Sequence, residues 1–397
     1  MKKNCKICKK KKLIKILDLG SQPPANALHN NKSLQKKFPL ILIFCVNCKT
    51  LQLSHAINPK DLFRNYLWVT RTSKTAKDHA KIFYKKVSKL INSKSNILEI
   101  ASNDGTFLRE FKKKNHNVLG VDPAKNLAKI ANRAGIKTIP HFFSDTLVRN
   151  KLNKNKYNLI FARNVIPHVK NIHSVVKGIS KLADKNTKIV IEFHYLRDIF
   201  RDLQYDSIYH EHLFYFSIYT ISNLFIKYGL YPNDYFDSPI SGGSVVLIFS
   251  KTKKKKSKKL KDLEKKEKST GINNLNKWLS FAEKAKKHKI QYLKILKKKY
   301  SNHKIFGYGA SARSSTFINY LKLNFKDIEF IIDNNKLKHN LYTPGSNIKI
   351  LSLKNGLKKI KNKSLVILAW NFKKEILNSL KNDRMKINKI IVPFSKK

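Results

Sequence analysis

Short apolar runs alternate with stretches of helical spacing along most of the chain. A helix is predicted from about Ser73 to Ile91, where apolar residues recur near helical spacing. Strands are predicted after it at residues 95–100, 117–121, 157–162, 188–193 and 243–250. Because strands that alternate with helices form a parallel sheet with helices on both faces, we expect residues 69–250 to be one doubly wound α/β domain.

The same alternation begins again towards the C-terminus. Strands are predicted at residues 303–307, 328–333, 364–370 and 387–392, with a helix at 312–323. We therefore expect residues 301–397 to form a second Rossmann-like domain. Residues 251–300 are expected to be a linker with a polar helix that continues to about Tyr300. Its Lys-rich run, 251–268, is either a solvated helix face or an arm that binds polyanions.

Length and hydropathy indicate several domains and no membrane span. At 397 residues and 42% hydrophobic content, two or three domains are expected. The longest apolar run, residues 38–46, contains Pro39 and is far shorter than the roughly 18–20 residues of a membrane helix. The basic start is followed by a short apolar stretch with Lys15 inside it, unlike a signal peptide. We expect a cytoplasmic monomer that does not bind membranes.

The formal net charge of +58 suggests a polyanion as partner. Only ten of the 83 basic residues are Arg, however, and the Lys residues are spread over the whole chain. Proteins that read bases and phosphates favour Arg, whose planar fork bonds two acceptors at once. We therefore interpret the charge as compositional drift rather than a polyanion-binding surface, and expect no specific nucleic acid partner.

The four cysteines form two Cys-x-x-Cys pairs, a spacing at which a tight turn directs two thiolates at one metal ion. We expect a structural zinc site in a domain of residues 1–68, with His29 and His55 as fallback ligands and residues 9–44 as an excursion between the pairs. The ligands would be Cys5, Cys8, Cys45 and Cys48. Unliganded cysteines or a redox pair are the alternatives. Four thiolates leave no open coordination position, so this metal would stabilise the fold and take no part in the chemistry.

A second candidate site lies where the first predicted strand of the central domain ends. The sequence there is Glu99-Ile-Ala-Ser-Asn-Asp-Gly105, and another acid, Asp122, follows the next strand. Ligands of nucleotide-binding folds lie at such strand ends. The motif lacks the three glycines of dinucleotide enzymes and resembles that of S-adenosylmethionine-dependent methyltransferases, whose positively charged cofactor a carboxylate attracts. Another nucleotide, or no ligand, is the alternative.

The most unusual stretch of the sequence, because of its dense cluster of titratable side chains, is Tyr205-Asp-Ser-Ile-Tyr-His-Glu-His-Leu-Phe-Tyr-Phe-Ser217. Two imidazoles, a carboxylate and a phenol within four residues indicate proton transfer or a metal, with a structural polar cluster as the alternative. In an extended segment Tyr209 and Glu211 would face one way, and His210 and His212 the other.

In this order, the motifs of the chain resemble those of the deoxysugar C-methyltransferases. Besides the motifs above, the resemblance rests on Asn164-Val-Ile-Pro-His168, Gly307-Tyr-Gly-Ala-Ser-Ala-Arg313 and Pro344-Gly345, and it covers nearly the entire chain. It implies a class I, Rossmann-like methyltransferase domain, preceded by a small zinc-binding domain and followed by a second Rossmann-like domain that helps to bind a nucleotide-linked sugar.

The resemblance also implies the reaction, which is methyl transfer from S-adenosylmethionine to the carbon beside the keto group of a nucleotide-diphosphate keto-deoxysugar. That carbon must first lose a proton to become an enolate, so a base is needed, and histidine is the natural one. By resemblance His212 is the base, with Tyr209, Glu211 and His168 near the sugar and the oxyanion. Tyr66 resembles a further tyrosine on the substrate side.

Two more sets of residues follow from the resemblance. The cofactor-binding set is Glu99, Ala101, Asn103, Asp104, Gly105, Asp122 and Asn164; the substrate-binding set is His210, Tyr215, Gly309, Ser311 and Arg313. Ala101 stands where the family often has Gly, which crowds the cofactor turn. In the C-terminal domain the Gly309 turn follows a predicted strand and opens a helix, so we expect it to bind the diphosphate, with Arg313 as counter-charge. A dinucleotide site or an empty turn is the alternative.

The sequence thus predicts a sugar C-methyltransferase with S-adenosylmethionine and structural zinc as cofactors. An RNA methyltransferase would share the cofactor motif, the cysteines and the charge. A non-catalytic, zinc-dependent nucleic-acid-binding protein is the rival outside enzymes. The acids Glu99, Asp104 and Asp122 and the histidine cluster disfavour that last possibility.

Overall fold

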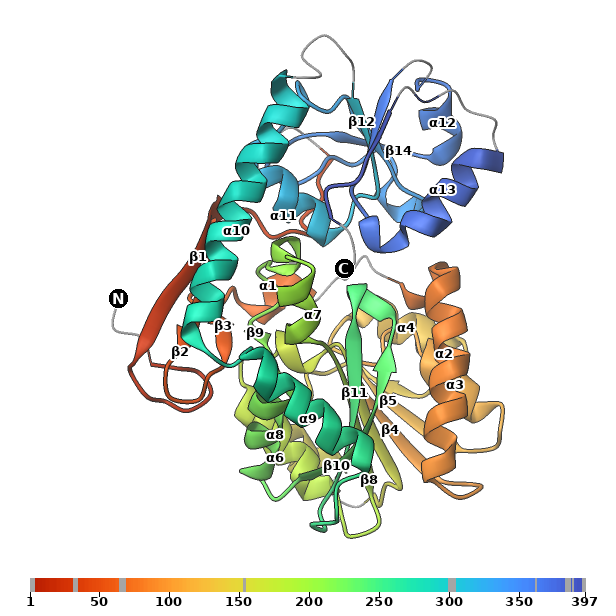
Figure 1. The fold of residues 1–397 in the computed structure, drawn as a ribbon. Coiled ribbons are helices and arrows are strands. Elements are labelled where there is room, and N and C mark those ends of the chain that lie inside the picture. Colours follow the sequence, from red (N-terminus) through yellow and green to blue (C-terminus); the bar gives the residue numbers. More distant parts are fainter. Residues whose placement is uncertain are drawn as a thin grey trace.

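The computed structural model describes residues 4–30, 35–63, 69–152, 155–298, 305–360, 363–382, 387 and 389–394. Within these ranges the chain forms three sheets, one for each part of the sequence (Figure 1). The N-terminal sheet lies beside both the central and the C-terminal domain, and helix α10 runs along it from one to the other (Figure 1). Tyr66, predicted on the substrate side, lies outside the described residues.

The N-terminal sheet is antiparallel, in the order β1-β2-β3-β9. Its strands are β1 (Leu13–Gln22), β2 (Phe38–Cys45), β3 (Leu51–Leu53) and β9 (Phe214–Tyr215), and the short helix α1 (Pro59–Phe63) follows β3. The sequence did not predict β1 or β2, because two register shifts in β1 interrupt the alternation of apolar and polar residues. The fourth strand, β9, comes from the central domain, so the two domains share this sheet.

The central sheet has the order β10-β11-β8-β7-β4-β5-β6. Its strands are β4 (Asn96–Ile100), β5 (Asn117–Val121), β6 (Thr138–Ile139), β7 (Leu159–Arg163), β8 (Lys188–His194), β10 (Tyr231–Ser238) and β11 (Ser244–Ser250). The predicted doubly wound α/β domain is confirmed, with a correction. The predicted strand at 243–250 is not parallel, since β11 pairs antiparallel with both β8 and β10.

The helices of this domain lie over the sheet and connect its strands. They are α2 (Lys74–Val87), α3 (Thr106–Lys112), α4 (Lys125–Arg133), α5 (Asp145–Leu147), α6 (Ile172–Leu182), α7 (Leu196–Arg201) and α8 (Ile218–Ile226). The predicted helix at 73–91 is confirmed as α2, which Ser73 caps by accepting a hydrogen bond from the main-chain N–H of Ala76.

The predicted linker helix is two helices, α9 (Lys258–Thr270) and α10 (Leu275–Leu293). Gly271 separates them because its φ of 66° is left-handed and ends α9. The prediction of a wholly polar helix is also wrong, because α10 buries Trp278, Phe281 and Ala285.

The C-terminal sheet is wholly parallel, in the order β14-β13-β12-β15-β16. Its strands are β12 (Ile305–Tyr308), β13 (Phe330–Ile332), β14 (Lys349–Leu351), β15 (Ser364–Ile367) and β16 (Lys389–Ile391), with helices α11 (Ala312–Tyr320), α12 (Leu353–Leu357) and α13 (Lys373–Asn382). The expected Rossmann-like fold is present here, although β14 was not predicted.

A buried ion pair joins the C-terminal domain to the central domain. Arg313 of α11 donates to both carboxylate oxygens of Asp206, at 3.0 Å from Nε and 2.8 Å from Nη2. The Trp370 indole N–H donates to Asp206 as well, at 2.8 Å, and Arg313 also donates to Gln204 at 3.0 Å. Both charges are thereby compensated between the two domains.

No helix in the described part of the chain is both long and apolar enough to cross a membrane.

Replacing Arg313 by Met should therefore destabilise the protein by about 3–5 kcal/mol, because Asp206 would keep a buried charge without its partner. Urea unfolding measures the change, and adding Asp206→Asn should recover part of it. Lys113→Met is the control, since that exposed pair with Glu110 contributes about 1 kcal/mol or less. Equal small losses in both single variants would contradict this account of the domain contact.

Candidate active site

A cavity of about 910 Å³ lies among the three domains. The N-terminal domain lines it with Asn26, Leu28, Asn58, Pro59 and Lys60; the C-terminal domain lines it with Ser311, Ala312, Arg313, Lys338, Asn371 and Phe372. The central domain contributes Glu99, Ala101, Asn103, Asp122, Arg163, Asn164, His168, His194, Tyr209 and His212. Most of the predicted site residues therefore meet in one space.

Five of the seven predicted cofactor residues line what we call the cofactor end of this cavity; Asp104 and Gly105 are not among its lining residues. Glu99 lies in β4 and Asp122 directly follows β5, and these neighbouring parallel strands end side by side. Asp122 accepts hydrogen bonds from the main-chain N–H groups of Asn103, at 2.7 Å, and Ala124, at 2.8 Å. Asp104 is buried behind the turn and accepts from the Thr106 hydroxyl at 2.7 Å.

The cofactor turn is tightly wound. Ala101, Asn103 and Gly105 have φ angles of 57°, 53° and 75°, all left-handed. A non-glycine residue such as Ala101 is strained in this region, which is why a glycine suits its position better. Asn164 is left-handed too, with φ of 49°, and its main-chain N–H donates to the Glu192 carbonyl at 2.8 Å.

Glu99 has the chemistry of a group that binds a cation. It is 2% exposed, and its Oε2 has no hydrogen-bond partner among the described residues. Burial raises the pKa of Glu99 well above its usual value, although the positive charge of Arg163 acts in the opposite direction. A positively charged amino group bound at this carboxylate would hydrogen-bond to Oε2. It would also balance the negative charge of the ionised carboxylate.

Arg163, at the end of β7, is a cavity residue that the sequence did not single out. Its Nε donates to Glu192 at 2.8 Å, and its guanidinium carbon lies 3.0 Å from the centre of the Phe107 ring. Burial alone would raise the pKa of Glu192, but the Arg163 charge and the hydrogen bond from His79 lower it to about 2. A charged residue at the end of a predicted strand was the signal that could have identified it.

Tyr209 and His212 contact each other at the other end of the cavity. The main-chain N–H of His212 donates to the Tyr209 carbonyl at 2.9 Å, so these residues form a turn, and the alternation expected for an extended segment does not apply. The turn places the Tyr209 hydroxyl 2.8 Å from His212 Nε2. His212 Nδ1 lies 3.1 Å from the Ser207 carbonyl, which can only accept. Nδ1 therefore carries the proton, and Nε2 accepts from Tyr209.

Three histidines share this end; His194 is buried, and His168 and His212 are half-buried. Burial lowers the pKa of His212 well below its usual value, and repulsion from His168 and His194 adds to the effect. Burial likewise lowers the pKa of His168 to about 4 and, together with the Arg313 charge, that of His194 to about 3. The His168 and His212 rings lie 4.6 Å apart. All three are neutral near pH 7, which leaves Nε2 of His212 able to take a proton; His194, at the end of β8, was not predicted.

The other predicted residues of this segment do not line the cavity. His210 Nε2 lies 3.1 Å from the Phe38 carbonyl of the N-terminal domain, and His210 is not among the residues that line the cavity. Tyr215 is 3% exposed within the apolar core and is not a lining residue either. Glu211 is buried and accepts from Asn26 Nδ2 at 2.9 Å.

The predicted phosphate-binding turn is filled by the protein's own groups. A Cβ on Gly309 would lie 2.2 Å from that of Ala369, so this residue is enclosed and does not reach the cavity. The main-chain N–H of Ala310 donates to Asp333 at 2.9 Å, and Ser311 caps α11 by accepting from the main-chain N–H of Ser314. Because Asp206 already compensates Arg313, the structure does not fit the predicted diphosphate site, although Ser311 and Arg313 line the cavity.

The four cysteines meet at the end of the N-terminal domain. Their sulfur atoms all lie within 4.8 Å of one another, with 3.6 Å from Cys5 to Cys48 and 3.5 Å from Cys8 to Cys45. Tetrahedral zinc with bonds of about 2.3 Å to sulfur needs sulfur atoms about 3.8 Å apart, so the donor set fits. Neither fallback ligand belongs to this group; His29 instead stacks on Tyr342.

Comparisons with known proteins match the chain in three successive parts. Family models match a zinc binding domain at residues 5–63, a methyltransferase domain at 73–233 and a C-methyltransferase C-terminal domain at 239–394. The curated C-methyltransferase NovU of Streptomyces niveus is 28% identical over 399 residues, which cover 98% of this chain and 95% of that protein.

Solved structures resemble part of the chain. The PH0226 protein of Pyrococcus horikoshii matches with a TM-score of 0.38 and 11% identity, over 49% of this chain and 99% of that one. Magnesium protoporphyrin IX methyltransferase of Synechocystis, solved with bound S-adenosylmethionine, matches with a TM-score of 0.33 and 12% identity, over 45% and 79%.

The metal site predicts one zinc ion per purified chain. Cys45→Ser should remove the metal and lower the melting temperature, because zinc binding and the folding of this domain are coupled. Elemental analysis and thermal unfolding measure the two effects. Metal-free protein with an unchanged melting temperature would contradict a structural role.

The cofactor end predicts that binding of S-adenosylhomocysteine becomes weaker as the pH falls. Burial raises the pKa of Glu99 and raises that of Asp122 to about 6, whereas the bound amino group and ribose hydroxyls favour the ionised carboxylates. Binding should therefore release protons, and affinity should fall as the pH drops through these raised values. Calorimetry in buffers of different ionisation enthalpy measures this release.

Glu99→Gln should reduce the proton release and weaken binding by roughly 10- to 100-fold, since it removes a charge-assisted hydrogen bond. Glu283→Gln, on the exposed face of α10, should change neither quantity. Proton release that is unchanged in Glu99→Gln would show that Glu99 does not contact the cofactor.

Proposed function

Because the chain is an S-adenosylmethionine-dependent C-methyltransferase, we propose that it methylates a nucleotide-diphosphate keto-deoxysugar at the carbon beside the keto group. The observation that carries the proposal is that a neutral histidine hydrogen-bonded to a phenol shares one cavity with the two cofactor carboxylates. Methyl transfer to oxygen or nitrogen needs no carbon acid to be deprotonated, whereas transfer to this carbon does.

The residues at the cofactor end bind and orient S-adenosylmethionine. When bound, S-adenosylmethionine supplies an electrophilic methyl group. Glu99 would pair with the cofactor's amino group, and Asp122 would accept from its ribose hydroxyls, since both line the cavity. The left-handed turn at Ala101 to Gly105 lets the main chain approach the cofactor closely.

The residues at the sugar end move the proton. The Tyr209 hydroxyl passes its proton to His212 Nε2 while its oxygen takes the hydrogen beside the keto group as a proton, so His212 is the base and Tyr209 the relay. The electron pair left on carbon is delocalised onto the keto oxygen as an enolate. We assign the stabilisation of this oxygen to His168, whose ring centroid lies 4.6 Å from that of His212. These residues would thereby prepare the carbon nucleophile for the methyl group that a bound S-adenosylmethionine would supply.

The three-domain organisation is part of the same proposal. We assign residues 1–68 to zinc binding, 69–250 to the cofactor and the base, 251–300 to the linker, and 301–397 to closing the cavity over the substrate. A monomer suffices, since one chain supplies every group named above. Cysteines that bind a metal ion and form no disulfide suit a reducing compartment, which supports a cytoplasmic location.

The order of events predicts exchange without methylation. With S-adenosylhomocysteine bound, the wild-type enzyme should exchange the hydrogen beside the keto group with deuterated solvent, which mass spectrometry detects. His212→Ala should lower the exchange rate by about 10²–10⁴-fold, as expected for loss of a general base, while S-adenosylhomocysteine binds as before. Because the pKa of His212 is lowered, the rate should fall on acidification only below about 6.5, the ordinary histidine value.

His141→Ala is the matched control, since His141 is exposed and outside the cavity lining, and it should exchange at the wild-type rate. An unchanged rate in His212→Ala would move the base elsewhere, with His168 next to be tested. Absence of exchange in the wild-type enzyme with every nucleotide-linked keto-sugar would reject the proposed substrate class.

A further inference from the structure

The turn that carries His212 is attached to the N-terminal domain at three points. His210 Nε2 lies 3.1 Å from the Phe38 carbonyl, and Glu211 Oε1 accepts from Asn26, at 2.9 Å from Nδ2 and 3.3 Å from the main-chain N. The Leu213 carbonyl accepts from the main-chain N–H of Leu53 at 2.9 Å. The residues on both sides of His212 are thus bound by the domain that holds the cysteines.

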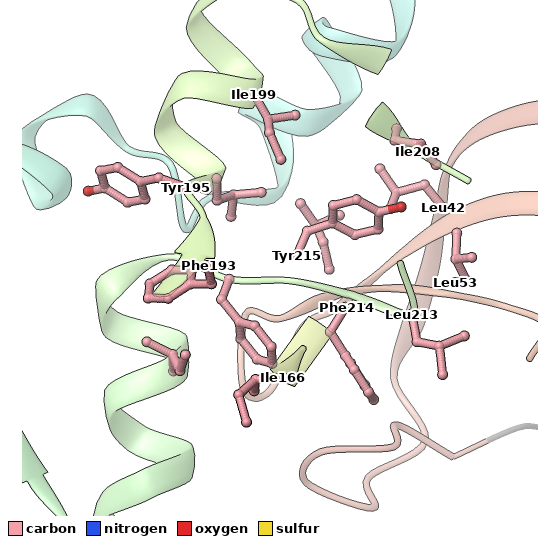
Figure 2. Packing of buried hydrophobic residues seen from close by; sticks show 14 of the residues in the cluster. Leu42, Leu53, Ile166, Phe193, Tyr195, Ile199, Ile208, Leu213, Phe214 and Tyr215 are labelled. Carbon is pink, nitrogen blue, oxygen red and sulfur yellow. The ribbon is translucent and has the colours of Figure 1, made fainter. Parts of the chain in front are cut away.

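The attachment continues past the turn as a shared sheet. Phe214 and Tyr215 of β9 pair antiparallel with Gln52 and Leu51 of β3. Figure 2 shows the apolar core at this junction, where Leu42 and Leu53 of the N-terminal sheet belong to one cluster with Ile208, Leu213 and Tyr215. These side chains come from both sides of the turn, so its two ends are fixed against the same surface.

Gln52 connects this sheet to the metal site. Its Nε2 donates to Cys5 Sγ at 3.1 Å, and its Oε1 accepts from the main-chain N–H of Lys6 at 3.0 Å. The residue that pairs with Phe214 therefore also contacts a zinc ligand. Only Leu213 separates Phe214 from His212 along the chain.

Packing alone does not explain why a carboxyl group is buried at Glu211. Glu211 is 2% exposed, Asn26 bonds one of its oxygens, and the other has no hydrogen-bond partner among the described residues. A buried carboxyl group destabilises a fold unless its bonds are made, so an apolar residue would serve packing better. Because the side chain does not line the cavity, it cannot contact substrate there, and a positioning role accounts for it.

We propose that the N-terminal domain positions the catalytic base, and that Asn26 and Glu211 are positioning residues that fix the turn from Tyr209 to His212. The proposal rests on the proposed function for the role of His212. The zinc ion then takes no part in the chemistry, yet the geometry of the Tyr209–His212 pair depends on the domain that the ion folds. A misplacement of a reacting group by about 1 Å can cost about 100-fold in rate.

The test compares Asn26→Ala with Asn30→Ala, since Asn30 is an exposed residue of the same segment. Asn26→Ala should lower the exchange rate by about 10- to 100-fold. Its zinc content, its affinity for S-adenosylhomocysteine and its KM for the sugar should stay near wild type. Asn30→Ala should match the wild-type enzyme in all four measurements.

A second readout needs no substrate. In protein labelled with ¹⁵N at histidine, the His212 signals, assigned by their loss in His212→Ala, should report an imidazole protonated at Nδ1. These signals should shift or broaden in Asn26→Ala and after chelation of zinc, but not in Asn30→Ala. If the wild-type enzyme exchanges no keto-sugar, the proposed function fails, while this readout still decides the positioning role.

Asn26→Asp gives a third, independent arm. It preserves the shape of the side chain but removes the donor and places two carboxyl groups together, which can bond only while they share a proton. Its exchange rate relative to wild type should therefore rise as the pH is lowered, which simple loss of stability would not produce. The proposal would be overturned if Asn26→Ala kept both the wild-type exchange rate and unchanged His212 signals. It would also be overturned if zinc-free protein gave wild-type His212 signals.

Discussion

The hydrogen bond between the Tyr209 hydroxyl and Nε2 of His212 is the contact on which the proposed chemistry depends. It exists only because the turn folds back on itself and because the Ser207 carbonyl holds the other ring nitrogen in its protonated form. Burial keeps the imidazole neutral, so Nε2 retains its lone pair near pH 7. The cavity that holds this base is lined by residues of all three domains.

The three domains together provide that site. The central sheet brings Glu99 and Asp122 to the ends of adjacent strands, and the N-terminal and C-terminal domains complete the cavity around the base. Each outer domain binds residues that lie close to the His212 turn in the sequence. The C-terminal domain bonds Asp206 through Arg313, and the N-terminal domain bonds Glu211 and β9. Binding of a substrate between the domains and alignment of the base are therefore coupled through the same short segment.

Features that depend on a local sequence pattern were predicted from the sequence. Features that depend on contacts between residues far apart in the chain were not. Strands β4 and β5 and the carboxylates that end them follow from short apolar runs closed by acids, and the metal site follows from cysteine spacing. Strand β1 was missed because its register shifts break the two-residue period. The ion pair of Arg313 was not predicted because its partner, Asp206, lies 107 residues away in the chain. The contacts of His210 and Tyr215 were not predicted because the turn and the shared sheet direct them towards the N-terminal domain.

The central claim is that one cavity holds the methyl donor against a carbon acid whose base is the Tyr209–His212 pair. The most direct measurement is a crystal structure with S-adenosylhomocysteine and a nucleotide-linked keto-sugar bound together. The account predicts the sulfur near Glu99 and the carbon beside the keto group between that sulfur and Tyr209 or His212, with that carbon about 3–3.5 Å from the accepting atom. A sugar bound outside this cavity, or with that carbon turned away from both residues, would contradict it.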